Sequence, residues 1–311
     1  MTNKVNDQSG SNNSRSDRSF YDEPIKAVRL RHPWRIFSAA LLVLWVIAFL
    51  TDAAGREAYD WNAYGEYVFD PRILKATIIT LQLTAYSMLI AISLGVILAV
   101  LRQSPNPVFK AVSWVFIWVF RGTPVYVQLV FWGLLSTIYP TLFFGAPFGG
   151  PGFSIDISHS SSLFWIAVVG LGLNEAAYMA EIVRAGLLSV DEGQEEAAKA
   201  LGMKWWATMR HIIIPQAMRI IIPPTGNEVI SMLKTTSLVT AVPVSSDLYT
   251  RSRDISAETF NPIPMLLIAS TWYLLITTIL MVAQYFLEKR FARGHAQIAY
   301  GADPKIIGEG A

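Results

Sequence analysis

The chain has 311 residues, of which 53% are hydrophobic and 15% are charged, and its mean hydropathy is +0.39. About a quarter of the residues of an ordinary soluble domain are charged, so this composition argues against a water-soluble globule and favours a polytopic membrane protein in a lipid bilayer. The net charge of +2 offers no electrostatic basis for binding a nucleic acid, and the absence of cysteine excludes disulfides and thiolate metal sites. The four histidines lack metal-ligand spacing, so we predict no metal site.

The N-terminal part of the chain changes abruptly from polar to apolar. Its first twenty residues are rich in Ser and Asn, and we expect residues 1–35 to form a disordered tail. The apolar run that follows, residues 36–52, predicts a first transmembrane helix. Small residues at Ala53-Ala54-Gly55 leave a cleavable signal peptide open as the alternative.

Five further stretches are long enough to cross about 30 Å of hydrocarbon as helices. Residues 76–101 and 261–287 contain no charged residue and are the clearest. The other three stretches carry embedded charges and comprise residues 110–138, 162–186 and 219–246. The sequence therefore predicts an all-α polytopic bundle of six transmembrane helices, with both termini on one side of the membrane.

Lys and Arg are concentrated in the segments on the same side as the termini, and cytoplasmic segments retain positive charge. The opposite segments hold only Arg56, Arg72, Lys75, Arg251 and Arg253. We therefore predict that both tails, including residues 293–311, are cytoplasmic in a bacterial plasma (inner) membrane. The Gly- and Pro-rich segment 139–162 is then an outer loop or a short re-entrant hairpin.

The cytoplasmic loop between the fourth and fifth spans, residues 189–217, has the pattern of two helices joined by a turn. Asp191 suits a helix start, Gly202 suits a left-handed helix end, and Pro215 is expected to stop the second helix. In the first helix, Ala197 and Ala198 predict a nearly flat surface that a partner could approach closely. In the second, an apolar stripe is expected to lie on the membrane or on packed spans, and consists of Trp205, Met209, Ile212 and Ile213.

This loop resembles that of the permease subunits of bacterial ABC importers, whose hallmark is a Glu-Ala-Ala loop with Gly six residues after the Glu and an Ile-x-Leu-Pro end. The chain matches at Glu196, Ala197, Ala198, Gly202, Ile212 and Pro215, with Ile214 in place of Leu. The resemblance implies an ATPase-coupling loop whose residues include Gly193, Glu196, Ala197, Ala198, Leu201, Gly202 and Pro215.

The resemblance covers roughly residues 74–292, a five-helix ABC-importer transmembrane domain, and narrows to polar amino-acid permeases of the histidine and glutamine type. The stretches that carry it are residues 120–124 with 127–129, 176–184, 193–196, 215–217 and a group made of Asn227, Lys234, Thr236, Ser237 and Leu238. The first span and the long outer loop depart from the compact five-helix core of the family.

The resemblance also implies the partners and the mechanism. A dimer of a separate ATPase, which binds ATP and Mg²⁺, docks on the coupling loops, a second permease completes the pathway by homo- or heterodimerisation, and an extracytoplasmic binding protein delivers the amino acid for inward transport by alternating access. The chain itself has no G-x-x-x-x-G-K-[ST] motif, so we predict a transporter subunit that has no catalytic residues and binds no cofactor.

Charges inside spans cost about 2.5–3.5 kcal/mol on insertion scales and usually face a bundle interior or an aqueous path. Arg121 precedes Gly122 and Pro124, which predicts a broken helix; the alternative is that Arg121 only ties spans together through a carboxylate. Glu181 and Arg184 are three residues apart and predict a structural ion pair. The candidate substrate path comprises Arg121, Thr123, Glu175, Tyr178, Asn227, Lys234 and Ser237.

Two polar groupings belong to this interpretation. Asn174, Glu175 and Tyr178, with Glu181 one turn further, are expected to share a polar face of the fourth span. The second grouping marks the fifth span and consists of Asn227, Glu228, Lys234 and Ser237. Pro223-Pro224 is expected to interrupt the start of that helix.

Two other classes of protein compete with the importer. An ion-coupled secondary transporter or channel would also have six spans with buried charges, but it gives no reason for the Glu-Ala-Ala loop. A membrane enzyme would be expected to cluster His, Asp or Glu for catalysis, and no such cluster is visible in the sequence.

Overall fold

The computed structural model describes residues 33–145, 151–157, 160–243 and 246–291, and it divides into two compact units, Met1–Arg56 and Glu57–Ala311. In the first unit the described residues form α1 (Pro33–Gly55), whose large apolar side chains are mostly exposed, as a helix facing hydrocarbon requires. Residues 33–35 of the predicted N-terminal tail belong to this helix; residues 1–32 and the tail 293–311 lie outside the described residues.

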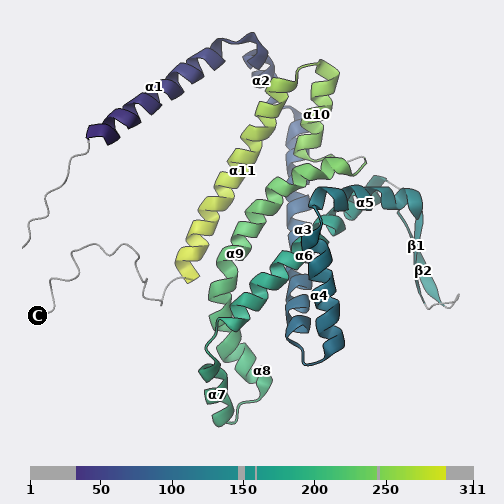
Figure 1. The fold of residues 1–311 in the computed structure, drawn as a ribbon. Coiled ribbons are helices and arrows are strands. Elements are labelled where there is room, and N and C mark those ends of the chain that lie inside the picture. Colours follow the sequence, from purple (N-terminus) through teal and green to yellow (C-terminus); the bar gives the residue numbers. More distant parts are fainter. Residues whose placement is uncertain (1–32, 146–150, 158–159, 244–245, 292–311) are drawn as a thin grey trace, which may run out of the picture. The chain divides into compact units, whose positions relative to one another are not determined.

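The second unit is mainly helical (Figure 1). Its elements in chain order are η1 (Glu57–Tyr59), α2 (Trp61–Tyr67), α3 (Pro71–Gln103), α4 (Pro107–Gly122), α5 (Val125–Ile138), β1 (Thr141–Gly145), β2 (Gly152–Asp156), α6 (Ser160–Leu188), α7 (Glu192–Ala200), α8 (Trp205–Thr208), η2 (Met209–Ile213), α9 (Ile214–Thr235), η3 (Thr236–Ala241), α10 (Leu248–Thr259) and α11 (Pro262–Phe291).

The core of this unit is the packing of α3 against α6, with α9 packed against both helices. Gly95 permits the close approach of α3 to α6, because a Cβ atom there would lie 2.6 Å from the Cβ of Met179. The hydroxyl of Ser87 donates to the carbonyl of Val168 at 3.1 Å, which adds a buried hydrogen bond between the same two helices. These contacts fix α6, which carries Asn174, Glu175, Tyr178, Glu181 and Arg184.

Within the described residues, four helices are long and apolar enough to cross a membrane: α1, α3, α6 and α11. The pair α4 and α5 also qualifies if it is one bent span. The fifth predicted span falls on α9 and η3, but α9 is not among the qualifying helices, so the predicted count of six is not confirmed. The mainly helical membrane architecture is confirmed.

The segment predicted as an outer loop contains an antiparallel β-hairpin, so the fold is not strictly all-α. β1 and β2 pair with Phe144 opposite Phe153, and the rings of these two residues stack with centroids 5.6 Å apart. Aromatic residues favour strands, and this propensity outweighed the Gly and Pro signal that indicated a loop. Residues 146–150 and 158–159 of the segment lie outside the described residues.

The prediction that prolines interrupt the helices around the fifth span is wrong at three positions. Pro215 lies in the first turn of α9, and Pro223 and Pro224 lie inside it. The residues that join α8, η2 and α9 have helical backbone angles, so one helix continues from Trp205 to Thr235. A π-turn precedes Pro215: the N–H of Ile214 donates to the carbonyl of Met209, five residues back, and this wider turn accommodates the ring.

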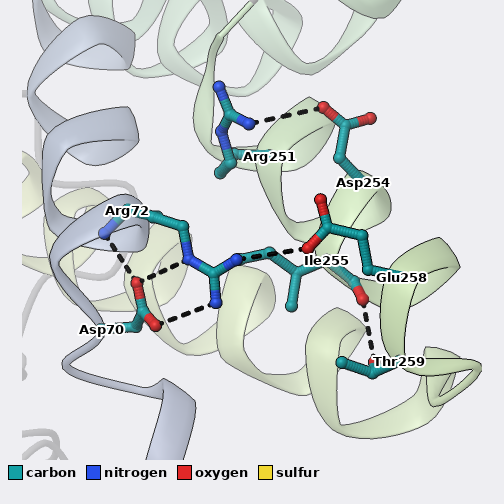
Figure 2. A network of polar contacts seen from close by, with 7 residues as sticks. All are labelled: Asp70, Arg72, Arg251, Asp254, Ile255, Glu258 and Thr259. Atoms are coloured by element: carbon teal, nitrogen blue, oxygen red, sulfur yellow. Dashed lines mark hydrogen bonds and ion pairs between the residues drawn. The ribbon is translucent and has the colours of Figure 1, made fainter.

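The end of the unit opposite the α7–α8 hairpin is held by a network of charges between α3 and α10 (Figures 1 and 2). Arg72 donates its backbone N–H to Asp70 at 2.7 Å and its guanidinium to Glu258 of α10 at 3.2 Å. The Arg72 side chain also donates to Asp70, and these hydrogen bonds hold the pKa of Asp70 below its usual value. The network positions α10 beside the start of α3.

Candidate functional site

The first helix of the α7–α8 hairpin, α7, begins and ends with well-formed caps. At its start, Asp191 accepts a hydrogen bond from the N–H of Gly193 at 2.7 Å, and a Cβ on Gly193 would lie only 2.8 Å from that carboxylate. At its end, Gly202 has φ +71°, and the N–H of Met203 donates to the carbonyl of Ala198. This is the left-handed helix end that the sequence predicts.

The hairpin presents one of its two adjacent alanines outward and buries the other. Ala198 is 1% exposed and lies on the side of α7 that packs against η2, whereas Ala197 and Glu196 are exposed. Leu201 is 82% exposed. The expected flat surface is therefore not formed by both alanines; its apolar part consists of Ala197 and Leu201.

The apolar stripe predicted for the second helix is only partly covered in the single chain. Ile213 is buried, whereas Trp205 is 64% exposed, and the neighbouring Trp206 is exposed as well. Met209 and Ile212 are intermediate. Large apolar side chains thus remain uncovered beside Leu201.

One polar region inside the bundle is the break between α4 and α5, where the chain bends by 103°. Two amide side chains bind the backbone carbonyls that the break releases. Gln128 donates to the carbonyls of Phe120 and Thr123, both at 3.1 Å, and to the hydroxyl of Thr123 at 2.6 Å. Asn174 of α6 donates to the carbonyl of Phe120 at 2.9 Å and to Gln128 at 3.1 Å. The break predicted from Arg121, Gly122 and Pro124 is confirmed.

Arg121 lies at this break and contacts an aromatic ring rather than a carboxylate. Its guanidinium carbon is 5.1 Å from the centroid of Tyr178, and it forms no ion pair within the part of the chain that the structure describes. Glu181 pairs with Arg184 at 2.7 Å. An open cleft of about 420 Å³ adjoins this region and is lined by Arg102, Trp114, Ile117, Trp118, Arg121, Gly122 and Glu181.

Another polar region lies between α6 and α9. The carboxyl group of Glu175 is buried and faces that of Glu228. The Oε1 atom of Glu175 has no hydrogen-bond partner, and neither carboxyl group forms an ion pair with a Lys or Arg among residues 33–145, 151–157, 160–243 and 246–291. Two ionised carboxylates only accept hydrogen bonds and cannot bond to each other. The two groups therefore either share a proton or hold a cation between them.

Glu175 therefore does not share one polar face with Asn174 and Tyr178, as the sequence suggested. Asn174 and Tyr178 point to the α4–α5 break, and Glu175 points to α9. The direction differs because adjacent helical positions are 100° apart.

The remaining predicted path residues lie on α9 and η3. Asn227 accepts a hydrogen bond from Gln284 of α11 at 3.0 Å, Lys234 is exposed, and the hydroxyl of Ser237 donates to the carbonyl of Lys234 at 2.7 Å. Asn227, Lys234 and Ser237 have spacings of seven and three residues, which place them along one side of the helix.

Comparison with known proteins identifies the family. The profile of the binding-protein-dependent transport system inner membrane component family matches residues 91–293. The chain belongs to this family. The permease is 57% identical over 273 residues to the arginine transport system permease protein ArgU of Corynebacterium glutamicum, covering 88% of this chain and 84% of the relative. It is 35% identical to the arginine transport system permease protein ArtQ of Bacillus subtilis, covering 71% of this chain and 92% of the relative.

Solved structures agree with this family. An amino acid ABC transporter crystallised with histidines has 32% sequence identity to the permease and a TM-score of 0.59, covering 71% of this chain and 95% of that chain. The MetNI methionine ABC transporter in an inward-facing conformation has 17% identity and a TM-score of 0.57, over 71% of this chain and 97% of that chain, and so supports the fold alone.

The permease is thus a multi-pass inner-membrane subunit of an amino-acid ABC importer, and it is not itself an enzyme. The candidate path residues did not include Gln128, which the structure places at the break. Glu228 was named only in the polar grouping of the fifth span, and the structure places it opposite Glu175. Both are polar residues inside predicted spans, and that placement was the available signal.

Proposed function

We propose that this permease moves a cationic amino acid, arginine above all, into the cell. The observation that carries the proposal is the pair of carboxyl groups of Glu175 and Glu228, which face each other without a Lys or Arg partner in the described part of the chain. A guanidinium group donates to two carboxylate oxygens at once and so fits such a pair. The two arginine permeases to which the chain is similar support this substrate.

The path beyond this pair runs along α9. Asn227, Lys234 and Ser237 mark one side of this helix and η3, and Lys234 is exposed in the single chain. An exposed charge within a span requires an aqueous path or a partner. We propose that a second permease, identical or related, covers this side and completes the path. Arg121, Thr123 and Tyr178 shape the wall at the α4–α5 break.

The energy for transport is supplied at the α7–α8 hairpin, before the start of α9. The charge distribution of the sequence supports cytoplasmic termini and a cytoplasmic hairpin. A dimer of a separate ATPase, which binds ATP and Mg²⁺, docks on two such hairpins through Glu196, Ala197 and Leu201, within the coupling segment 189–217. Because the helix continues from Trp205 to Thr235, a movement of the hairpin is carried directly to Glu228.

The mechanism that follows is alternating access. ATP binding draws the two hairpins together and moves α9 relative to α6, which opens the Glu175–Glu228 pair to an extracytoplasmic binding protein that delivers arginine. ATP hydrolysis returns α9 and α6 to their starting arrangement, and the substrate leaves on the cytoplasmic side. An ion-coupled transporter would need no such exposed hairpin joined to a path helix.

The experiment is uptake of labelled arginine by proteoliposomes that contain the permease with its cognate ATPase and binding protein. Glu175→Gln keeps the size of the side chain and removes its carboxyl group, and we expect it to lower arginine uptake about tenfold or more, because a carboxylate accepts hydrogen bonds from a guanidinium more strongly than an amide does. Glu66→Gln, at an exposed position on α2 outside the candidate path, is the matched control and should transport normally. Unchanged arginine uptake by Glu175→Gln, or a wild-type preference for glutamate, would contradict the proposal.

A further inference from the structure

The cleft beside the α4–α5 break carries more positive charge than its own residues neutralise. It is formed by α3, α4 and α6, and its charged lining residues are Arg102, Arg121 and Glu181. Glu181 already pairs with Arg184 at 2.7 Å, and the described residues supply neither Arg102 nor Arg121 with an ion-pair partner. The Nη1 atom of Arg102 is buried and has no hydrogen-bond partner there. A buried guanidinium nitrogen without a partner is costly, so an anion is the ligand that fits the cleft.

The position of the cleft along the helices indicates where this anion comes from. Arg102 lies in the last turn of α3, a helix of 33 residues. Such a helix is about 50 Å long, against about 30 Å of hydrocarbon, so its end reaches the headgroup region of the bilayer. The parallel rings of Trp114 and Trp118, with centroids 5.9 Å apart, also line the cleft. Tryptophan is enriched at this depth, where lipid headgroups meet the acyl chains.

The surface next to the cleft is apolar. Val112, Val115 and Val119 of α4 are exposed, and the two tryptophans are also more than half exposed. A cleft with two cationic groups that opens beside the apolar surface of residues 112–119 is complementary to an amphipathic anion: a phosphate in the cleft and acyl chains along α4. A free phosphate would use the arginines alone and leave the apolar surface uncovered.

We propose that this cleft binds the headgroup of an anionic phospholipid, with the phosphate between Arg102 and Arg121 and the acyl chains against α4. Basic pockets between transmembrane helices are known to hold such headgroups. The bound lipid would neutralise the cleft and support the α4–α5 break at Arg121.

In the test, the complete assembly is equilibrated with vesicles that contain equal amounts of phosphatidylglycerol and phosphatidylcholine and is then purified. Mass spectrometry measures the lipid that it retains. We expect phosphatidylglycerol to be enriched about tenfold over phosphatidylcholine, from the attraction of two arginines. The double variant Arg102→Gln with Arg121→Gln should lose the enrichment, and Arg102→Lys, which keeps the charge, should retain most of it. Arg290→Gln removes an exposed charge from the last turn of α11 and serves as the matched control.

The outcomes that overturn the proposal are separate and measurable. Wild-type enrichment in the double variant, or an equal loss in Arg290→Gln, would show that the cleft does not select the lipid. Displacement of phosphatidylglycerol by inorganic phosphate would assign the cleft to a free anion. Displacement by arginine would make it part of the substrate path, whereas failure of arginine uptake in Glu175→Gln tests the proposed function independently.

Discussion

Two stretches of the permease carry prolines that predict an interrupted helix, and they fold in opposite ways. At Pro124 the helix breaks and the chain bends by 103° between α4 and α5. At Pro215, Pro223 and Pro224 the helix continues, from α8 through η2 into α9. Proline therefore does not decide by itself whether a span is broken.

The difference lies in what happens to the backbone groups around each proline. At the α4–α5 break, Gln128 and Asn174 bind the carbonyls of Phe120 and Thr123, so that an open backbone is tolerated inside the bundle. Before Pro215 a π-turn absorbs the ring without opening the helix. The broken region can bend the proposed path wall, whereas the continuous helix can transmit movement over its whole length.

The largest effect should come from removing the amide that holds the break. Gln128→Ala leaves the carbonyl of Thr123 and an amide of Asn174 with fewer partners in a buried site, and we expect the free energy of unfolding to fall by about 2 kcal/mol. Denaturant unfolding of the detergent-purified protein measures this. Gln103→Ala is the control, because Gln103 is exposed and its amide donates within its own helix, to the carbonyl of Ala99. Equal stability of the two variants would mean that the amide does not support the break.

A smaller effect is expected in the continuous helix. Pro223→Ala and Pro224→Ala restore backbone N–H groups to a helix that is already formed, so the unfolding free energy should change by about 1 kcal/mol or less, and the helix content should stay the same. Far-UV circular dichroism with thermal unfolding checks both quantities. A clear rise in helix content would show that the helix is interrupted in the native permease, in disagreement with α9 as described.

The sequence could predict features that depend on local chemistry. Uncharged stretches indicated α3 and α11, the order Arg-Gly-Thr-Pro indicated the break, and Asp191 and Gly202 indicated the ends of α7. Each signal comes from a few adjacent residues and needs no distant partner. Coupling and path residues remain predictions, because their roles involve partner molecules.

Features that depend on distant contacts could not be predicted. Ala197 and Ala198 are chemically identical, and only the packing of α7 on η2 makes one buried and the other exposed. The opposition of Glu175 and Glu228 likewise depends on how α6 packs against α9. The β-hairpin was missed because its Gly and Pro residues concealed two short runs with high strand propensity.

The central claim is that an exposed hairpin connects a separate ATPase to a helix that lines the path for arginine. The most direct test is ATP-driven uptake of labelled arginine by the reconstituted assembly that carries Glu196→Arg on α7, compared with Glu66→Arg on α2, both of which are exposed positions. The account predicts that Glu196→Arg loses both the bound ATPase and the uptake, and that Glu66→Arg keeps both. Uptake by Glu196→Arg at the wild-type rate, driven by an ion gradient without ATP, would contradict it.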